Sequence, residues 1–411
     1  MLFFSIFILF GILALSEMFF TGKETILNGD SQLFGYLSIY ESYFRKYHHK
    51  IFFISFGLVS LLAIFRYGVG TDYFSFLFLY NQVPALTNVG ISTFWATIQN
   101  IHGELGFLFT IGILRSFDIG YIFYVMTLTA IMMYGLYHFI QKHTTSKLLA
   151  LFIFYCMYYF TYITNAQRQG FVLIIFMFIL LDLLLQKKYI LYVIIVVVCS
   201  LFHTSILVVL ILPFLNNKFK KYFLITGYLF AITNFIGTIF IGADFITTVI
   251  GISNAYGVSG ISILGILSRS IMLGIILSLM FLTKEDKRTI FLKNILIYYF
   301  AGFAIYIAFA NIPIMASRLF VYFQILEIII ISHLLFKLHS KWRKMFVLIL
   351  VLLIMPIFYW NNINAELIQG GYFNVSSILN YPYTHIFNPR RIREYRSISN
   401  YSRQFIWWWY Q

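Results

Sequence analysis

Long apolar runs, each close to the length of a membrane-spanning helix, recur along this 411-residue chain. In hydrocarbon such a run satisfies its own backbone N–H and C=O groups only as a helix of ~20 residues or within a closed barrel. The runs are continuous Ile, Leu, Phe and Val, without the apolar–polar alternation of barrel strands. Because 61% of the residues are hydrophobic and 10% are charged, we predict an all-α, polytopic helical integral membrane protein.

About ten transmembrane helices are predicted from the runs, with edges good to a few residues. The runs are Leu2 to Phe20, Ile51 to Phe65, Gly120 to Ile140, Leu148 to Tyr162, Phe171 to Leu185, Tyr222 to Ile241, Ile261 to Leu282, Ile290 to Ala310, Leu319 to Phe336 and Met345 to Trp360. A shorter run at 105–115 can hardly cross alone and is predicted to be a re-entrant or interfacial helix. The first run lacks a preceding basic residue and is expected to be retained. We predict one transmembrane domain, 1–411.

Basic residues concentrate in short loops between the runs, and the positive-inside rule places such loops in the cytoplasm. Loops 66–104, 163–168, 242–260 and 311–318 are poor in Lys and Arg, so they are predicted to face outward. Membrane orientation thereby accounts for the net charge of +15, and no nucleic acid partner is expected.

Inner and outer loops should alternate along the chain, and one stretch does not follow this order. Lys188 and Lys218 are both predicted to be cytoplasmic, although a single apolar stretch separates them. We predict that 189–215 forms a membrane hairpin of two short helices that enters from the cytoplasm and turns at "FHTS", near His203. The alternative is a single long crossing with an outside basic loop, which labelling of a cysteine at Asn217 distinguishes. The scheme places the C-terminal tail, 361–411, outside despite its arginine cluster, since a basic aromatic tail can lie on lipid headgroups.

Ionisable side chains cost a few kcal/mol at bilayer depth, so they usually face a cavity, a partner or the interface. Six of them fall in the predicted outward half: Arg66, Asp72, Glu104, Arg168, His203 and Arg318. Two glycines in "YGVGT" allow a tight path that brings Arg66 near Asp72, with Tyr73 beside them. A structural interpretation stays open for each: an interfacial pair for Arg66 and Asp72, and a helix cap for Glu104.

Helix starts at the outer face provide candidate phosphate sites. Arg168 and Gln169 open one such helix, where the positive helix end and a guanidinium fork favour an anion. Arg318 repeats the arrangement after Pro313. A simple flanking charge is the alternative for both arginines. The neutral imidazole of His203 is a candidate proton acceptor, or else a hydrogen-bonded structural group.

Guanidinium groups, carboxylates and many aromatic rings on one side suit an anionic, lipid-linked carbohydrate. The sequence has no HExxH, GxSxG or CxxC motif and no outward DxD pair, so protease, serine hydrolase, redox and metal-dependent sugar chemistry lack support. Cys156 and Cys199 lie in apolar runs and are predicted to be buried free thiols. No cofactor and no metal are expected.

Several of these elements, in this order and spacing, resemble the EpsG family, a branch of the Wzy-type polysaccharide polymerases. They are "FRYGVGTDY" after the second run, "GELGF" at 103, "RQ" at 168, "LFHTS" at 201 and "YPY" at 381. Two positions depart from the family pattern: Leu105, where the family often has proline, and Gly170, where it often has a small polar residue.

The resemblance implies a multi-pass protein of the bacterial inner membrane that joins undecaprenyl-pyrophosphate-linked oligosaccharide repeat units at the outer face. The product is O-antigen, capsule or exopolysaccharide, and a chain-length regulator and a flippase of the same pathway are expected partners. The implied site has three parts: Arg66, Arg168 and Arg318 for the pyrophosphate, Asp72, His203 and Glu104 for catalysis, and Tyr73 and Gln169 for the sugar. Either Asp72 or His203 acts as the base.

Two other functions remain open on the sequence. A lipid-linked oligosaccharide flippase or another transporter also needs a cationic cavity, but the chain shows no convincing internal repeat of the kind that alternating access uses. A membrane acyltransferase that modifies the glycan would share a buried histidine, but no acyl-donor site is evident. A polymerase mutant should leave a single repeat unit outside, whereas a flippase mutant should accumulate that unit inside.

Overall fold

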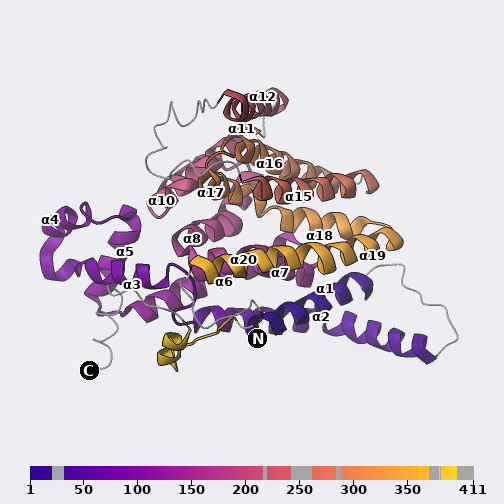
Figure 1. Cartoon of the computed structure of the whole chain (residues 1–411), viewed down its shortest axis with the longest axis horizontal. Coiled ribbons are helices and arrows are strands. Elements are labelled where there is room, and N and C mark those ends of the chain that lie inside the picture. Colours follow the sequence, from indigo (N-terminus) through magenta and orange to yellow (C-terminus); the bar gives the residue numbers. More distant parts are fainter. Residues whose placement is uncertain are drawn as a thin grey trace. The chain divides into compact units, whose positions relative to one another are not determined.

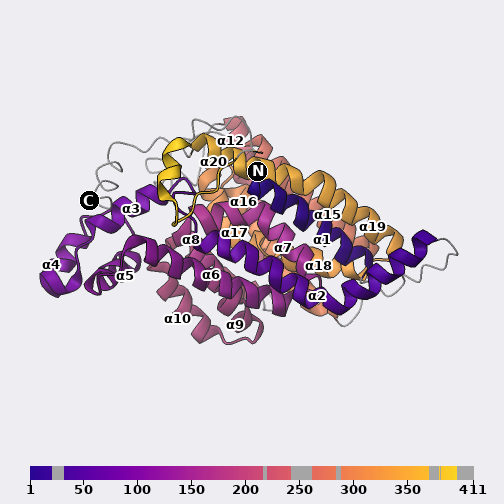
Figure 2. The same ribbon diagram turned by 90° about the horizontal axis from the view of Figure 1, so that it is seen from below.

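The computed structural model describes residues 1–20, 32–215, 220–241, 262–283, 288–369, 379 and 381–395. These residues are mainly helical (Figures 1 and 2), and the β-type pairing found among them is one isolated antiparallel bridge between Arg66 and His385. Eight of the described helices are long and apolar enough to cross a membrane, or nine if a bent pair counts as one span. The protein is a polytopic helical membrane protein, as the apolar runs predicted.

Contacts between residues divide the chain into two compact units, and one transmembrane domain over 1–411 stays a prediction. The first comprises Met1–Phe178, Leu201–His203 and His339–Gln411, and the second comprises Ile179–Ser200 and Thr204–Leu338. The boundary at Phe178 falls inside the continuous helical segment Gln167–Leu185.

The first unit holds the N-terminal half of the chain and its C-terminal helices. Its elements are α1 (Leu2–Phe20), α2 (Gln32–Ile64), α3 (Tyr73–Gln82), α4 (Leu86–Ile98), α5 (Leu105–Ser116), α6 (Tyr121–His143), α7 (Lys147–Phe154), the π-helix η1 (Tyr155–Asn165), α8 (Gln167–Ile175), α19 (Ser340–Ile349), the π-helix η4 (Leu350–Ile354), α20 (Met355–Gln369) and the 3₁₀-helix η6 (Pro389–Glu394). α1 packs against α2, α7 and α19. The short run predicted at 105–115 is the helix α5.

The centre of the first unit is the segment formed by α7 and η1. Its apolar window is 83% buried, more than that of any other span described. The π-helical turns end at Asn165, where the N–H of Ala166 donates to the carbonyl of Thr161 at 2.7 Å. Such widened turns often occur at functional sites. This one ends three residues before Arg168.

The start of α7 is fixed by a buried carboxylate from α1. Glu17 is 1% exposed, and its two oxygens accept the N–H groups of Lys147 and Leu149, each at 2.8 Å. A carboxylate suits the positive end of a helix, and His48 of α2 contacts the same group. Glu17 therefore joins three helices at the end of the unit that was predicted to be cytoplasmic.

The second unit is built from α9 (Leu181–Leu185), α10 (Tyr189–Ser200), the 3₁₀-helix η3 (Thr204–Ile211), α11 (Leu212–Leu215), α12 (Lys220–Ile241), α15 (Ile263–Leu282), α16 (Arg288–Ala308), α17 (Pro313–Gln324) and α18 (Glu327–Lys337), and the π-turn η2 (Phe176–Leu180) straddles the boundary between the units. α16 packs against both α12 and α17. α17 and α18 form one predicted run that bends by 45°. At this bend Glu327 is fully buried and accepts a hydrogen bond from the Tyr299 hydroxyl at 2.9 Å.

Two short helices stand where we predicted the hairpin. α10 packs against η3, and the Tyr192 hydroxyl donates to the carbonyl of Val209 at 2.8 Å. The turn between them is Leu201–His203, which clusters with the first unit. The side from which the hairpin enters the membrane stays a prediction, and Asn217 and loop 242–260 lie outside the described residues.

Candidate functional site

The segment "FRYGVGTDY" is pressed against the end of the π-helix η1. Gly70 has a φ of +104°, and a Cβ there would lie 2.3 Å from the carbonyl oxygen of Thr164, so both its conformation and its surroundings require glycine. The backbone N–H of Asp72 donates to the side-chain oxygen of Asn165 at 2.9 Å, and the Thr71 hydroxyl donates to the same oxygen. Asp72 is thereby held just ahead of α3.

Arg66 is enclosed, with 1% of its surface exposed. Its Nη1 donates to the carbonyl of Ala63 at 2.6 Å and to the Thr129 hydroxyl at 2.9 Å. Burial lowers the pKa of this guanidinium, and nearby phenol groups, those of Tyr159 and Tyr73 foremost, oppose the shift. Its Nε and Nη2 have no hydrogen-bond partner among the described residues. Arg66 thus occupies the interior of the first unit.

A C-terminal segment, here called the tail strap (residues 381–395), covers the Arg66 loop. Tyr67 donates to the carbonyl of Thr384 at 2.9 Å, and Ile386 donates to the carbonyl of Phe65 at 3.1 Å. Ile392 packs against Gly68, where a Cβ would lie 2.7 Å from its Cγ1. Segments more than 300 residues apart therefore form one layer over Arg66.

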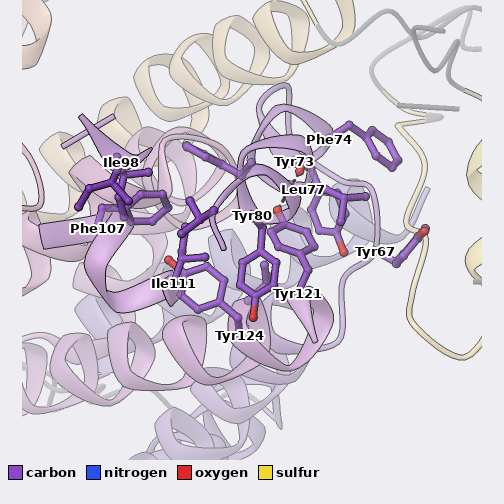
Figure 3. Packing of buried hydrophobic residues seen from close by; sticks show 14 of the residues in the cluster. Tyr67, Tyr73, Phe74, Leu77, Tyr80, Ile98, Phe107, Ile111, Tyr121 and Tyr124 are labelled. Carbon is purple, nitrogen blue, oxygen red and sulfur yellow. Dashed lines mark hydrogen bonds between the residues drawn. The ribbon is translucent and has the colours of Figure 1, made fainter. Parts of the chain in front are cut away.

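Tyr73 belongs to an aromatic cluster formed by α3, α5 and α6 (Figure 3). Its ring meets that of Tyr121 edge to face at 5.3 Å, and the Tyr121 hydroxyl donates to the Tyr73 carbonyl at 2.8 Å. Burial raises the pKa of the Tyr73 phenol. The ring that the sequence assigned to sugar binding is 1% exposed, and it fixes α3 on α6.

Three predicted site residues meet in the first unit, although they come from three separate segments. Glu104 precedes α5, Arg168 lies in the first turn of α8, and His203 ends the turn after α10. The Glu104 carboxylate accepts a hydrogen bond from Arg168 Nη1 with one oxygen and contacts His203 Nδ1 at 2.8 Å with the other. The N–H of Gly106 donates to the carbonyl of Leu201 at 2.8 Å and fixes these loops together. We call this group the Glu104 trio.

The electrostatics of the Glu104 trio favour an ionised carboxylate. Burial by itself raises the pKa of Glu104, but the hydrogen bond with His203 and the charge of Arg168 outweigh it and hold that pKa below its usual value. Because Nδ1 of His203 faces a carboxylate, the ring proton is assigned to Nδ1. His203 Nε2 then carries the lone pair, and it is buried without a hydrogen-bond partner among the described residues.

Arg168 lies against two aromatic rings. Its guanidinium carbon lies 5.3 Å from the ring centre of Phe76 and 5.5 Å from that of Phe107. Two residues on, a Cβ at Gly170 would lie 1.8 Å from the carbonyl oxygen of Tyr162, so α8 starts directly against η1. Gln169 is buried at 4% exposure.

Two cavities of the first unit share Arg168 as a wall. The larger cavity, of about 910 Å³, lies along α3 and α4. We call it the polar cleft for its hydroxyl, amide and imidazole groups, those of Ser75, Gln82, Thr93, Thr97, Asn100 and His102, although apolar side chains, those of Phe76, Phe78, Leu79, Ala96 and Ile101, also line it. The apolar pocket, of about 340 Å³, lies along α5 and α6, and its lining includes Phe107, Leu114, Phe123, Leu128, Phe171 and Phe202. The sequence analysis missed the lining of the polar cleft, because hydroxyl and amide residues in a short helix carry no distinctive motif.

The remaining predicted site residue belongs to the second unit. Arg318 lies on α17 and is exposed. Its predicted cooperation with Arg168 in one pyrophosphate site stays a prediction. Within the described part of the chain no group of three or more His, Cys, Asp or Glu side chains is arranged to hold a metal ion. Cys156 and Cys199 are buried free thiols.

A family model described as the EpsG family matches residues 49–385. The chain belongs to the EpsG family. Members of the EpsG family are Wzy-type polysaccharide polymerases, so membership indicates a role as a polysaccharide polymerase. The range matched to EpsG contains the Arg66 loop, the Glu104 trio, Arg318 and the first part of the tail strap. No curated protein and no solved structure matches the chain.

Proposed function

We propose that this protein is a membrane glycosyltransferase of the bacterial inner membrane. It joins undecaprenyl-pyrophosphate-linked oligosaccharide repeat units at the outer face of that membrane, and the product is an O-antigen, a capsule or an exopolysaccharide. The observation that carries the proposal is the Glu104 trio: a guanidinium at a helix start and a carboxylate-oriented imidazole lie together beside a polar cleft. The reaction needs both an anion-binding group and a proton acceptor.

The anion-binding group is Arg168. It lies in the first turn of α8, where the positive end of the helix dipole favours negative charge. One terminal nitrogen of its planar fork contacts Glu104, and the fork offers further N–H donors to phosphate oxygens. As the glycosidic C–O bond to the pyrophosphate breaks, these donors stabilise the charge on the departing undecaprenyl pyrophosphate.

The proton acceptor is Nε2 of His203. A hydroxyl of the acceptor sugar forms the new bond to the anomeric carbon of the donor glycan, and its proton passes to Nε2. Glu104 holds the Nδ1–H side of the ring and stabilises the imidazolium that results. Asp72 is the alternative base, although its backbone and its neighbour Thr71 are tied to Asn165.

The other predicted site residues receive supporting roles. Arg66 and Tyr73 are enclosed by the tail strap and the aromatic cluster, so we assign them to holding the loop ahead of α3 and not to direct contact with substrate. The glycan occupies the polar cleft, whose hydroxyl and amide groups match sugar hydroxyls. Gln169 is retained as a substrate-side residue of α8, and Arg318 stays a candidate pyrophosphate ligand on the sequence alone.

Replacement of Arg168 tests the proposal. In the native host Arg168→Ala should leave glycan carrying a single repeat unit, because losing one preorganised donor to a developing charge costs roughly 10²- to 10³-fold in rate. Glycan gels and analysis of lipid-linked intermediates measure the product, and immunoblots measure protein level. Lys188→Ala, an exposed cation elsewhere, is the matched control.

Full-length polymer from Arg168→Ala at normal protein level would contradict the assigned role. Accumulation of the repeat unit on the cytoplasmic side would favour a flippase instead. The same gels with Arg318→Ala test whether that arginine belongs to the site.

A further inference from the structure

The apolar pocket runs along one face of α6. Phe123, Thr127 and Ile131 follow one another at four-residue spacing, which aligns their side chains on one face of a helix. Tyr124 and Leu128 line the same pocket. The opposite walls come from α5 and from the start of α8. The pocket is thus a groove between three helices.

This groove is accessible from outside the protein. Phe123 is 59% exposed and Ile131 is 53% exposed, and both lie on a helix that is long and apolar enough to cross a membrane. Exposed apolar side chains on such a helix contact lipid. A hydrocarbon chain can therefore enter the groove sideways from the bilayer without crossing water.

The only charged side chain among the residues that line the pocket is that of Arg168. The same guanidinium lines the polar cleft. A ligand that is apolar at one end, anionic where it passes Arg168, and carries hydroxyl groups on an otherwise compact body at the other end would complement both cavities, since hydroxyl, amide and aromatic side chains line the second one. Few biological molecules combine these three parts in that order.

We propose that the apolar pocket binds the isoprenoid units nearest the pyrophosphate of a polyprenyl carrier, with the pyrophosphate on Arg168 and the glycan in the polar cleft. The inference rests on the proposed function, and it adds which cavity holds which part of the donor. Both volumes fall in the range of ~300–1,000 Å³ that is usual for ligand pockets. The pocket is the smaller cavity, so the distal part of a long carrier stays in the bilayer.

Binding of short probes to the intact protein in lipid nanodiscs tests the inference. The probes are farnesyl pyrophosphate, farnesol and inorganic pyrophosphate. Thr127→Trp places an indole in the groove from an exposed position, so that the fold is left intact. Ile54→Trp, at a 69% exposed position on α2, is the matched control.

Wild-type protein should bind farnesyl pyrophosphate more tightly than either farnesol or inorganic pyrophosphate, since only that probe fills the groove and reaches Arg168. Thr127→Trp should lower the affinity for farnesyl pyrophosphate about tenfold, which corresponds to the burial of roughly two methylene groups. It should leave inorganic pyrophosphate binding unchanged, and Ile54→Trp should bind all three probes as wild type does. A farnesyl pyrophosphate analogue with a diazirine on its last isoprene unit should label peptides that contain residues 123–131.

Equal binding of farnesyl pyrophosphate by Thr127→Trp and wild type, or labelling elsewhere, would overturn the pocket assignment. Equal affinity for farnesol and farnesyl pyrophosphate would show a nonspecific apolar groove and would also overturn it. These outcomes differ from failure of the polymerase proposal, which is judged by polymer length in Arg168→Ala cells. Normal polymer in that variant together with specific labelling of α6 would mean a lipid site in a protein with another activity.

Discussion

At the scale of single residues, the carboxylate of Glu104 binds the guanidinium of Arg168 with one oxygen and the imidazole of His203 with the other. In the folded protein its pKa lies below the usual value of 4.5. The ionised carboxylate therefore stabilises the fold above pH 4.5, and this stabilisation is lost as the pH falls through the lower pKa of the folded protein. Glu104→Gln keeps an acceptor for His203 but removes the charge. The variant should melt at a lower temperature than wild type near neutral pH, and this difference in melting temperature should close in acid, as the pH falls below 4.5 and through the lower pKa of the folded protein.

Thermal unfolding of both proteins in the same detergent, followed across that pH range, measures the effect. A difference in melting temperature that is the same at every pH would show that the shape of the side chain, and not its charge, explains the lower stability of the variant. Gln186→Glu, at an exposed position of the second unit, is the control for a change of charge.

The residues of the Glu104 trio were predictable because ionisable groups are rare and costly in such a chain. Each was found separately in "GELGF", "RQ" and "LFHTS", and no sequence spacing showed that one carboxylate would serve both partners. Arg66 drew attention for the same reason, but its enclosure depends on a strap more than 300 residues away. A local motif carries no information about such a distant cover.

At the scale of helices, the close approach of α8 to η1 depends on Gly170. Its missing side chain faces the backbone oxygen of Tyr162, which has no freedom to rotate away. Gly170→Ala should therefore destabilise the protein by about 1–3 kcal/mol or more, as overpacking of a close contact does. It should also shift Arg168, since that residue lies on the same first turn of α8.

Gly57→Ala on α2 is the control, because nothing lies within 4 Å of a Cβ at that position. Detergent-solubilised melting curves and polymer length should change in Gly170→Ala and stay unchanged in Gly57→Ala. Wild-type stability in both variants would mean that α8 does not lie against η1 as described.

The long helices were predictable because a bilayer sets their length and composition. The predicted Leu2 to Phe20 is α1, and the predicted Gly120 to Ile140 begins at the N-cap of α6 (Tyr121–His143) and ends within that helix. The bend between α17 and α18 was not predicted. No glycine or proline marks it, and the buried Glu327 at the bend is bound by Tyr299 of α16, a contact that hydropathy does not reveal.

At the scale of the whole molecule, the pairing of Arg66 with His385 constrains the topology of the membrane protein. Two backbone segments that hydrogen-bond to each other lie on the same side of the bilayer, so the tail strap shares the side of the Arg66 loop. The Glu104 trio lies among segments that are predicted to face outward, whereas Glu17 contacts the start of α7 beside a basic loop that is predicted to be cytoplasmic. The pairing ties the tail strap to the side that the Arg66 loop takes, and the outer side stays a prediction from the distribution of basic residues.

Cysteine labelling in whole cells tests this arrangement. Phe387→Cys, 75% exposed on the strap, should react with a membrane-impermeant maleimide, as should His102→Cys at the exposed rim of the polar cleft. His49→Cys, at an exposed position near the basic start of the span Lys46–Ile64 in α2, should react only after the membrane is permeabilised. The native Cys156 and Cys199 are buried and should contribute little background. Labelling of Phe387→Cys together with His49→Cys, and not with His102→Cys, would separate the strap from the Arg66 loop and remove the cover that encloses Arg66.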